Sequence, residues 1–189
     1  MTQVQRQQAT TSNKENTPGT LLLEFLIILL VTFALVFGIV RPFIAEVFYI
    51  PTESMVPTLE VGDRVLVSKL IYLFSGPQRG DIVVFESYYW DAEGVDLVKR
   101  VVGVPGDNVK VVRGSLYVNG ERWEEAYLNY ELPDESAYGP ITVPEGYIFV
   151  MGDNRADSAD SRYIGPVPLD YLVGKAFVRL WPLEQVGLL

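Results

Sequence analysis

One long apolar run dominates the first quarter of the chain. Positions 21–40 hold a single charged residue, Glu24, and the segment 26–37 has no polar face at helical spacing. A helix of twenty residues reaches about 30 Å, which matches the hydrocarbon core of a bilayer. The run therefore predicts a membrane-spanning helix rather than a buried helix of a soluble core.

The residues around this run indicate how it is used. A cleavable secretion signal would have a shorter apolar core and end in small residues, whereas Phe37 to Pro42 follows here. We therefore expect an uncleaved anchor over residues 20–41, closed by Arg41 before Pro42. Residues 1–19 are rich in Gln, Thr and Asn, which predicts a disordered tail. The flanking charges do not decide the orientation of the anchor.

Beyond Pro42 the apolar pattern changes to short β-branched runs separated by turn residues. The expected strands are 64–68, 81–86, 97–102, 108–112, 115–118, 147–151 and 174–180. Asn119-Gly120, between two such runs, predicts a type I′ hairpin. No second long helical pattern is present. Residues 42–189 should form one mainly antiparallel β domain.

Two stretches of this domain carry no clear strand pattern. Residues 124–140 are polar and bear several tyrosines, which indicates a long surface excursion. The connector after Pro42 contains Phe43, Ile44, Phe48 and Tyr49, and such a segment can lie at a membrane interface.

Composition removes several classes of chemistry. The 189 residues include no cysteine and no histidine, and the formal net charge is −9. Disulfides, thiolate nucleophiles, cysteine-type zinc sites and a Ser-His-Asp triad are therefore excluded. Nucleic acid is not an expected partner, because its binders need clustered Lys and Arg. Asp153, Asp157 and Asp160 lack the spacing of a calcium loop, so we expect no metal and no cofactor.

Ser54 and Lys99 are the candidate nucleophile and base. Ser54 lies between Pro51 and Pro57, where a serine ordinarily serves a turn or cap. Lys99 lies in an apolar stretch typical of a half-buried strand, where desolvation lowers the pKa of an amine. A neutral amine can act as a general base, although a solvated strand lysine is the ordinary alternative. Alternation places Arg100 on the opposite face, so we expect only one of the two to point inward.

Four segments in order resemble the motifs of type I signal peptidases, the membrane-anchored Ser/Lys endopeptidases that remove signal peptides. The segments are Ile50-Pro-Thr-Glu-Ser-Met-Val-Pro-Thr-Leu59, Arg79-Gly-Asp-Ile-Val-Val-Phe85, Lys99-Arg-Val-Val-Gly-Val-Pro-Gly-Asp107 and Met151-Gly-Asp-Asn-Arg-Ala-Asp-Ser-Ala-Asp-Ser-Arg162. The resemblance extends over nearly all of residues 48–180. With the membrane run in front, the layout is similar to that of bacterial or cyanobacterial members.

The resemblance implies roles for the residues that match these motifs. Ser54 would attack the scissile carbonyl to form an acyl-enzyme, and Lys99 would take its proton. The backbone N–H of Ser54 and the hydroxyl of Thr52, where relatives often have serine, would form the oxyanion hole. Ser158 would hydrogen-bond the lysine amine and orient it. An ion pair between Asp160 and Arg162 would brace the site, with Asp153 and Arg155 in the same framework.

The resemblance also implies the substrate and its binding. Signal peptides have small residues at the first and third positions before the scissile bond, which requires two shallow apolar pockets. The first pocket would be lined by Ile50, Pro51, Met55, Leu59 and Val98, and the second by Phe48, Val65 and Val84. All of these could equally be core residues. An extended substrate should pair with residues 96–99, beginning at Asp96.

The expected partners are exported preproteins and the lipid bilayer. The catalytic domain would lie on the extracytoplasmic side of a plasma or thylakoid-type membrane, and a monomer is the working expectation. Two alternatives stay open. A self-cleaving repressor of similar fold would need a DNA-binding domain in place of the membrane run. A membrane-tethered β domain that only binds exported peptides would need neither Ser54 nor Lys99.

Overall fold

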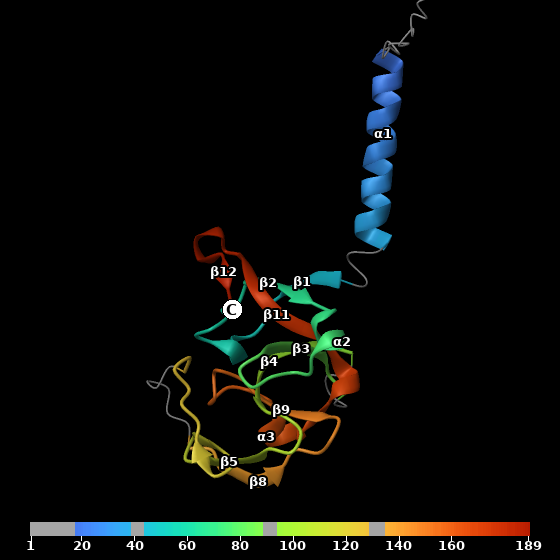
Figure 1. Cartoon of the computed structure of the whole chain (residues 1–189). Helices are drawn as coiled ribbons and strands as arrows, with labels where there is room; N and C mark the ends of the chain where they lie inside the picture. Colours follow the sequence, from blue (N-terminus) through green and yellow to red (C-terminus); the bar gives the residue numbers. More distant parts are fainter. Residues whose placement is uncertain (1–17, 39–43, 89–93, 129–134) are drawn as a thin grey trace, which may run out of the picture. The chain divides into compact units, whose positions relative to one another are not determined.

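The computed structural model describes residues 18–38, 44–88, 94–128 and 135–189. These form two compact units, residues 1–40 and 41–189, which are considered separately. The first unit contains the helix α1 (Pro18–Leu35), within a helical segment that reaches Gly38 (Figure 1). The 21 residues of that segment extend for about 31 Å and are apolar enough to cross a bilayer. Residues 1–17 of the predicted tail and the Arg41–Pro42 boundary lie outside the described residues, whereas residues 18 and 19, which were expected in the tail, belong to α1.

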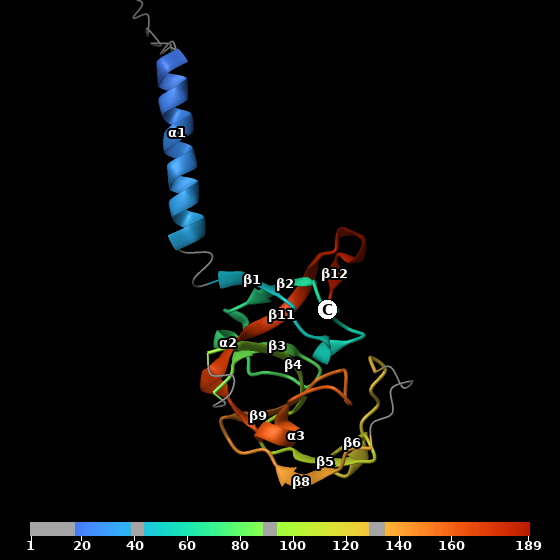
Figure 2. The ribbon, with the colours of Figure 1, turned by 180° about the vertical axis from the view of Figure 1, so that it is seen from behind.

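The second unit is built of two antiparallel sheets, which confirms the predicted fold class. Its strands are β1 (Ala45–Tyr49), β2 (Arg64–Ser68), β3 (Ile82–Glu86), β4 (Asp96–Gly103), β5 (Asn108–Val112), β6 (Ser115–Val118), β7 (Glu121–Arg122), β8 (Tyr138–Thr142), β9 (Tyr147–Met151), β10 (Val167–Pro168), β11 (Leu172–Trp181) and β12 (Gly187–Leu188). The large sheet has the order β1-β2-β11-β3-β4-β9-β10, with β12 on β11, and the small sheet has the order β7-β6-β5-β8. Figures 1 and 2 show the small sheet at the end of the unit away from β1, β2 and β12.

Short helical turns connect the strands. They are the 3-10 turns η2 (Glu53–Met55), η3 (Leu169–Tyr171) and η4 (Leu183–Gln185), and the four-residue helices α2 (Ile71–Phe74) and α3 (Ser161–Ile164). In the part of the chain that the structure describes, α1 is thus the one long helix, as the sequence predicted. The turn at Asn119-Gly120 has positive φ at both residues, 54° and 86°, which is the predicted type I′ geometry.

The core lies against the strands that carry the candidate residues. One cluster contains Ile50, Met55 and Leu59 together with residues of β2, β3 and β11. A second cluster joins the two sheets through Phe149 and Met151 of β9 and the inner faces of β5 and β6. β4 pairs with β3 and β9 along its edges, and both of its faces are packed, because Val98 and Val102 join these two clusters while Val101 joins a third. The strand in the middle of the domain therefore has almost no solvent face.

The structure bears on two sequence predictions about this unit. In the connector after Pro42, residues 45–49 form β1 on β2, with Phe48 packed against the core and Val47 and Tyr49 exposed, and its position at a membrane interface stays a prediction. Phe43 lies outside the described residues. Of the stretch 124–140, which was expected as a surface excursion, the structure describes residues 124–128 and 135–140; Glu125 is buried, and residues 138–140 begin β8. The ion pair of Glu125 with Arg155, rather than an apolar pattern, holds residues 124–128 on the domain, so their hydrophobicity gave no signal.

Candidate active site

Ser54 lies in the turn η2, which is fixed from both sides. Met55, which follows it, is 1% exposed within the core, and burial of a methionine side chain contributes about 1.5–3 kcal/mol. Asn154, in the loop after β9, donates its backbone N–H to the carbonyl of Ser54 at 3.1 Å. Its side-chain Nδ2 donates to the carbonyl of Glu53 at 3.2 Å. The side chain of Ser54 thus projects from a turn that can move little.

Lys99 of β4 reaches this hydroxyl. Its Nζ lies 2.7 Å from Oγ of Ser54 and 3.0 Å from the carbonyl of Val98. The lysine is 3% exposed. It lies 45 residues from the serine in the sequence, so it is the fold of the domain that brings the two side chains together. When the amine is neutral, its lone pair can accept the hydroxyl proton across the same contact. The pair therefore has the geometry of a nucleophile and its general base.

The surroundings of Lys99 favour the neutral amine. Burial lowers its pKa from 10.5 to about 8, against the opposing effect of the carboxylates of Asp160 and Asp153. At pH 7 the amine of an exposed lysine is neutral, with a free lone pair, in only a very small fraction of molecules. A pKa of about 8 raises that fraction to roughly one in ten at pH 7. The environment thus makes Lys99 a usable base close to neutral pH.

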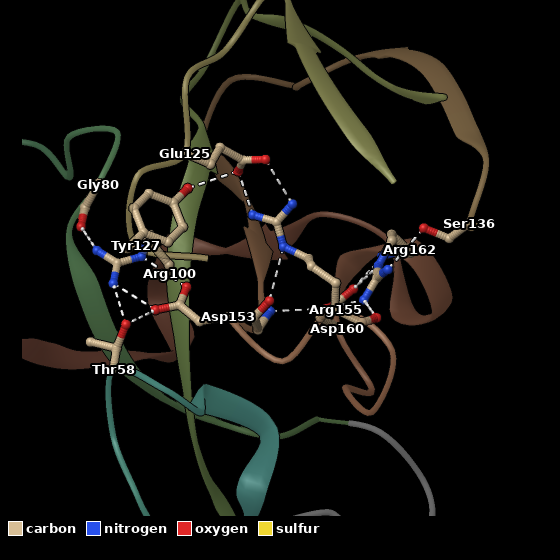
Figure 3. A network of polar contacts seen from close by, with 11 residues as sticks. Thr58, Gly80, Arg100, Glu125, Tyr127, Ser136, Asp153, Arg155, Asp160 and Arg162 are labelled. Atoms are coloured by element: carbon tan, nitrogen blue, oxygen red, sulfur yellow. Dashed lines mark hydrogen bonds and ion pairs between the residues drawn. The ribbon is translucent and has the colours of Figure 1, made fainter. Parts of the chain in front are cut away.

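Arg100, the neighbour of Lys99, is buried as well, and this corrects a prediction. Alternation was expected to leave only one of the two inward, but Lys99 is 3% and Arg100 8% exposed. Arg100 forms an ion pair with Asp153 and donates to the carbonyl of Gly80. Its guanidinium also lies 3.9 Å from the ring centre of Tyr127 (Figure 3). The reason is that both faces of β4 are covered. Lys99 and Arg100 point to opposite faces, and each of these faces is buried.

The loop after β9 is a buried polar framework rather than a solvated loop. Arg162 pairs with Asp160, as predicted, with Nε 2.9 Å from Oδ1. Asp160 Oδ2 accepts the N–H of Gly152 at 2.9 Å. Arg155 pairs with Glu125, which the sequence did not single out. Figure 3 shows these contacts beside a second group around Thr58 and Arg100, and the two groups meet where the guanidinium of Arg100 lies over the ring of Tyr127.

A small cleft opens beside the two reactive atoms. Its walls are formed by residues 50–52, 54–55 and 95–99. Along its β4 wall, the strand pairs with β3 from Asp96 to Arg100 but with β9 only from Arg100 onward. Within the described residues, the backbone at 96–99 therefore has no neighbouring strand on the second side.

Comparison with known proteins places this geometry in a family. The model of the signal peptidase family, peptidase S26, matches residues 22–181. The chain belongs to this family. A probable signal peptidase I-2 of Synechocystis sp. is 42% identical over 187 residues, covering 95% of this chain and 83% of the relative. Signal peptidase I of Leptolyngbya laminosa is 43% identical over 153 residues, covering 78% and 74%. A solved signal peptidase I from Enterococcus faecalis V583 is 34% identical and covers 53% of this chain and 97% of that one, with a TM-score of 0.46.

In this signal peptidase-family chain, Ser158 does not make its predicted contact. The expected hydrogen bond to the amine of Lys99 is not formed, and among the described residues the buried Oγ of Ser158 has no partner. The amine instead uses Ser54 and the carbonyl of Val98. Ser158 packs on Gly152, where an added β-carbon would lie 2.2 Å from its Oγ. Its position beside Gly152 is therefore fixed by close packing.

Thr52 lies beside Ser54 at the cleft. Its Oγ1 lies 3.3 Å from Oγ of Ser54, and its side chain is exposed at the cleft. The hydroxyl can therefore turn toward a substrate carbonyl bound at Ser54. Its extra methyl restricts χ1 compared with serine.

The predicted pocket residues divide into two groups. Ile50, Pro51, Met55 and Val98 line the cleft, and Asp96 lies at its β4 wall. Leu59, Val65 and Val84 are 0% exposed core residues and are not among the walls of this cleft, so their role in substrate pockets stays a prediction. Phe48 packs against the same core from β1. A buried side chain in an alternating strand looks the same in sequence whether a pocket or a core covers it.

Sequence reasoning also missed several residues of the site. Val95 and Leu97 line the cleft but were not predicted to do so. The wall formed by residues 95–99 begins one residue before β4. Asn154 was not assigned a role, although it holds the turn that carries Ser54. No signal in a single sequence separates such a side chain from an ordinary loop asparagine.

Proposed function

We propose that this chain is a serine endopeptidase that removes N-terminal signal peptides from exported preproteins after small-x-small sites. Ser54 is the nucleophile and Lys99 the general base. One observation carries the assignment: the buried Nζ of Lys99 lies 2.7 Å from Oγ of Ser54 in a chain without histidine.

The chemistry follows from this pair. Neutral Lys99 takes the hydroxyl proton as Oγ of Ser54 attacks the scissile carbonyl carbon. The oxyanion that forms is stabilised by the backbone N–H of Ser54 and the hydroxyl of Thr52. When the C–N bond breaks, the Lys99 ammonium returns its proton to the leaving amine, and an ester of Ser54 remains. Lys99 then takes a proton from a water as its oxygen attacks the ester carbonyl carbon. When the ester C–O bond breaks, the Lys99 ammonium returns this proton to Oγ of Ser54, and the released carboxyl group of the signal peptide ionises in solution.

The cleft supports binding of an extended substrate. The free side of residues 96–99 can accept a strand by backbone hydrogen bonds, which tolerate many sequences. Selectivity then depends on side chains near the scissile bond. Ile50, Met55 and Val98 form an apolar wall close to Ser54, which favours small apolar residues before the cleaved bond.

The remaining layout belongs to the same proposal. The apolar segment predicted over residues 20–41, whose helix α1 begins at Pro18, anchors the enzyme in the bilayer; the residues before α1 are a tail, and residues 42–189 are the catalytic domain. The domain faces the extracytoplasmic side of a plasma or thylakoid-type membrane and acts as a monomer. Anchoring raises the effective concentration of the enzyme at substrates that emerge from the same membrane.

The test is cleavage of a precursor that carries Ala-x-Ala before its cleavage site. Wild type should release the mature protein. Ser54→Ala and Lys99→Ala should each lose at least about 10²–10⁴-fold in rate, the range of general-base catalysis. Lys110→Ala, which changes an exposed lysine on β5, is the matched control and should cleave normally. Full activity in Lys99→Ala would show that another base acts. Peptide binding by wild type without cleavage would favour the binding-domain alternative.

A further inference from the structure

The segment 123–128, which follows β7, packs side chains on three arginines, two of which, Arg100 and Arg155, belong to the polar framework of the site. Trp123 lies under Arg79, with the guanidinium carbon 5.3 Å from the ring centre. Glu125 pairs with Arg155, and the ring of Tyr127 covers Arg100. Arg100 adjoins the base, and Arg155 adjoins the loop that holds the nucleophile. The segment thus contacts both halves of the site from outside the cleft.

Glu125 is the most enclosed acid of this segment. Its side chain is 4% exposed, as is that of Arg155. The two form a bidentate pair, with Nη1 of Arg155 2.9 Å from Oε2 of Glu125 and Nη2 on Oε1. The hydroxyl of Tyr127 donates to the same Oε1 at 2.8 Å (Figure 3). A buried carboxylate with all its partners in place is rigid, and removing its charge leaves Arg155 buried without a counterion.

Arg155, held by Glu125, in turn holds the backbone of Gly152. Its Nε donates to the carbonyl of Gly152 at 3.0 Å, and its own carbonyl accepts from Nη2 of Arg162 at 2.7 Å. Arg162 pairs with Asp160, which binds the N–H of Gly152. Both polar groups of the Gly152 backbone are therefore held by charged side chains. The backbone of Gly152 also packs closely on that of Ser54, because a β-carbon on Gly152 would lie 2.4 Å from the carbonyl oxygen of Ser54.

Asn154, two residues on, connects this clamp to the nucleophile. Its backbone N–H and side chain bind the carbonyls of Ser54 and Glu53. We propose that Glu125 is a positioning residue for the reaction: through Arg155 it fixes the loop 152–154, and through Asn154 it fixes the turn that carries Ser54. This inference rests on the proposed role of Ser54 as the nucleophile.

The proposal predicts a specific kinetic signature. A misplaced nucleophile reacts more slowly once substrate is bound, whereas the cleft that binds substrate is formed by other residues. Glu125→Gln, which keeps the shape of the side chain, should lower kcat about 10- to 100-fold with little change in KM. The midpoint of the pH profile should stay in place, because the charges that act on the Lys99 amine are those of Asp160 and Asp153. Glu124→Gln is the matched control, since Glu124 is the exposed neighbour, and it should behave as wild type.

A double-mutant cycle separates positioning from general loosening of the fold. Asn154→Ala removes the side-chain bond to the carbonyl of Glu53. If Glu125 acts through Asn154, the double variant should lose scarcely more kcat than the larger single loss, whereas independent effects would multiply. Tyr127→Phe, which removes only the hydroxyl bond to Glu125, should give a smaller loss in the same direction. It serves as the test if Glu125→Gln does not fold.

Amide hydrogen exchange in the full-length protein gives a readout that needs no catalysis. The N–H of Asn154 is donated to Ser54, so its protection should fall in Glu125→Gln and not in Glu124→Gln. Absence of cleavage by wild type would overturn the proposed function but would leave this measurement valid. Unchanged exchange at Asn154, or kcat losses that simply multiply, would overturn the positioning role.

Discussion

Replacement of Lys99 by methionine should abolish cleavage and at the same time stabilise the catalytic domain. Methionine has nearly the same length and volume but carries no charge, so it removes the cost of burying an ammonium. The pKa of Lys99 falls from 10.5 to about 8 on folding, because burial disfavours the charged form. A shift of that size corresponds to about 3 kcal/mol of stability that wild type lacks near neutral pH.

The pH dependence gives this prediction its sign. Below pH 8 the amine is protonated in both states, so the folded protein carries the full cost. Between pH 8 and 10.5 the unfolded chain binds the proton and the folded protein does not, so the stability of wild type rises with pH. Lys99→Met lacks this titration. Its advantage over wild type should therefore shrink by about 2 kcal/mol between pH 6 and pH 9.5.

Urea unfolding in detergent solution measures both quantities. The three tryptophans, at positions 90, 123 and 181, all lie in the second unit, so their fluorescence reports on the catalytic domain. Lys110→Met, at an exposed position of β5, is the matched control and should change stability little at any pH. Equal stability of Lys99→Met and wild type at pH 6, or a difference independent of pH, would refute the reasoning about the buried amine.

Three further predictions concern the same site. Thr52→Val should lower kcat by about 10²–10³-fold, the usual effect of losing an oxyanion donor, while Thr52→Ser retains activity; equal rates for Val and Ser in the cleavage assay would remove Thr52 from the oxyanion hole. Asp160→Asn should move the midpoint of the pH–rate profile to lower pH, because the carboxylate raises the pKa of Lys99, whereas Asp157→Asn, at an exposed position of the same loop, should leave it in place. A midpoint that rises in Asp160→Asn would contradict this electrostatic account. Treatment with a chelator should not change the rate, since neither step proposed for Ser54 and Lys99 uses a metal; a clear loss restored by added metal would contradict that chemistry.

The sequence predicted the elements whose local pattern matches their surroundings. β2, β5, β6 and β9 begin and end where their apolar runs do, and the Asn119-Gly120 turn has the expected geometry. β1 and β8 were missed for local reasons. β1 exposes Val47 and Tyr49, and β8 contains Pro140, which fits a strand at the edge of its sheet. Neither presents the alternation by which a strand is recognised.

Only those residues of the site that belong to the recognised motifs could be predicted from the sequence. Ser54 and Lys99 could be named from residue type and resemblance, but their contact depends on how η2 packs on β4. Glu125 could not be found, because it is one acid among several in a polar stretch and its partner Arg155 is 30 residues away. Leu59, Val65 and Val84 show a second limit, since the sequence cannot separate a pocket residue from a core residue and the structure buries all three in the core.

The pH dependence of kcat/KM for precursor cleavage tests the central claim most directly, because it reports the groups that titrate in the free enzyme. The account predicts a rate that rises about tenfold per pH unit on the acid side and levels off with a midpoint near 8, the pKa of the buried Lys99 amine. A midpoint near 10.5, the value of an ordinary lysine, or the same rising limb in Lys99→Ala, would contradict it.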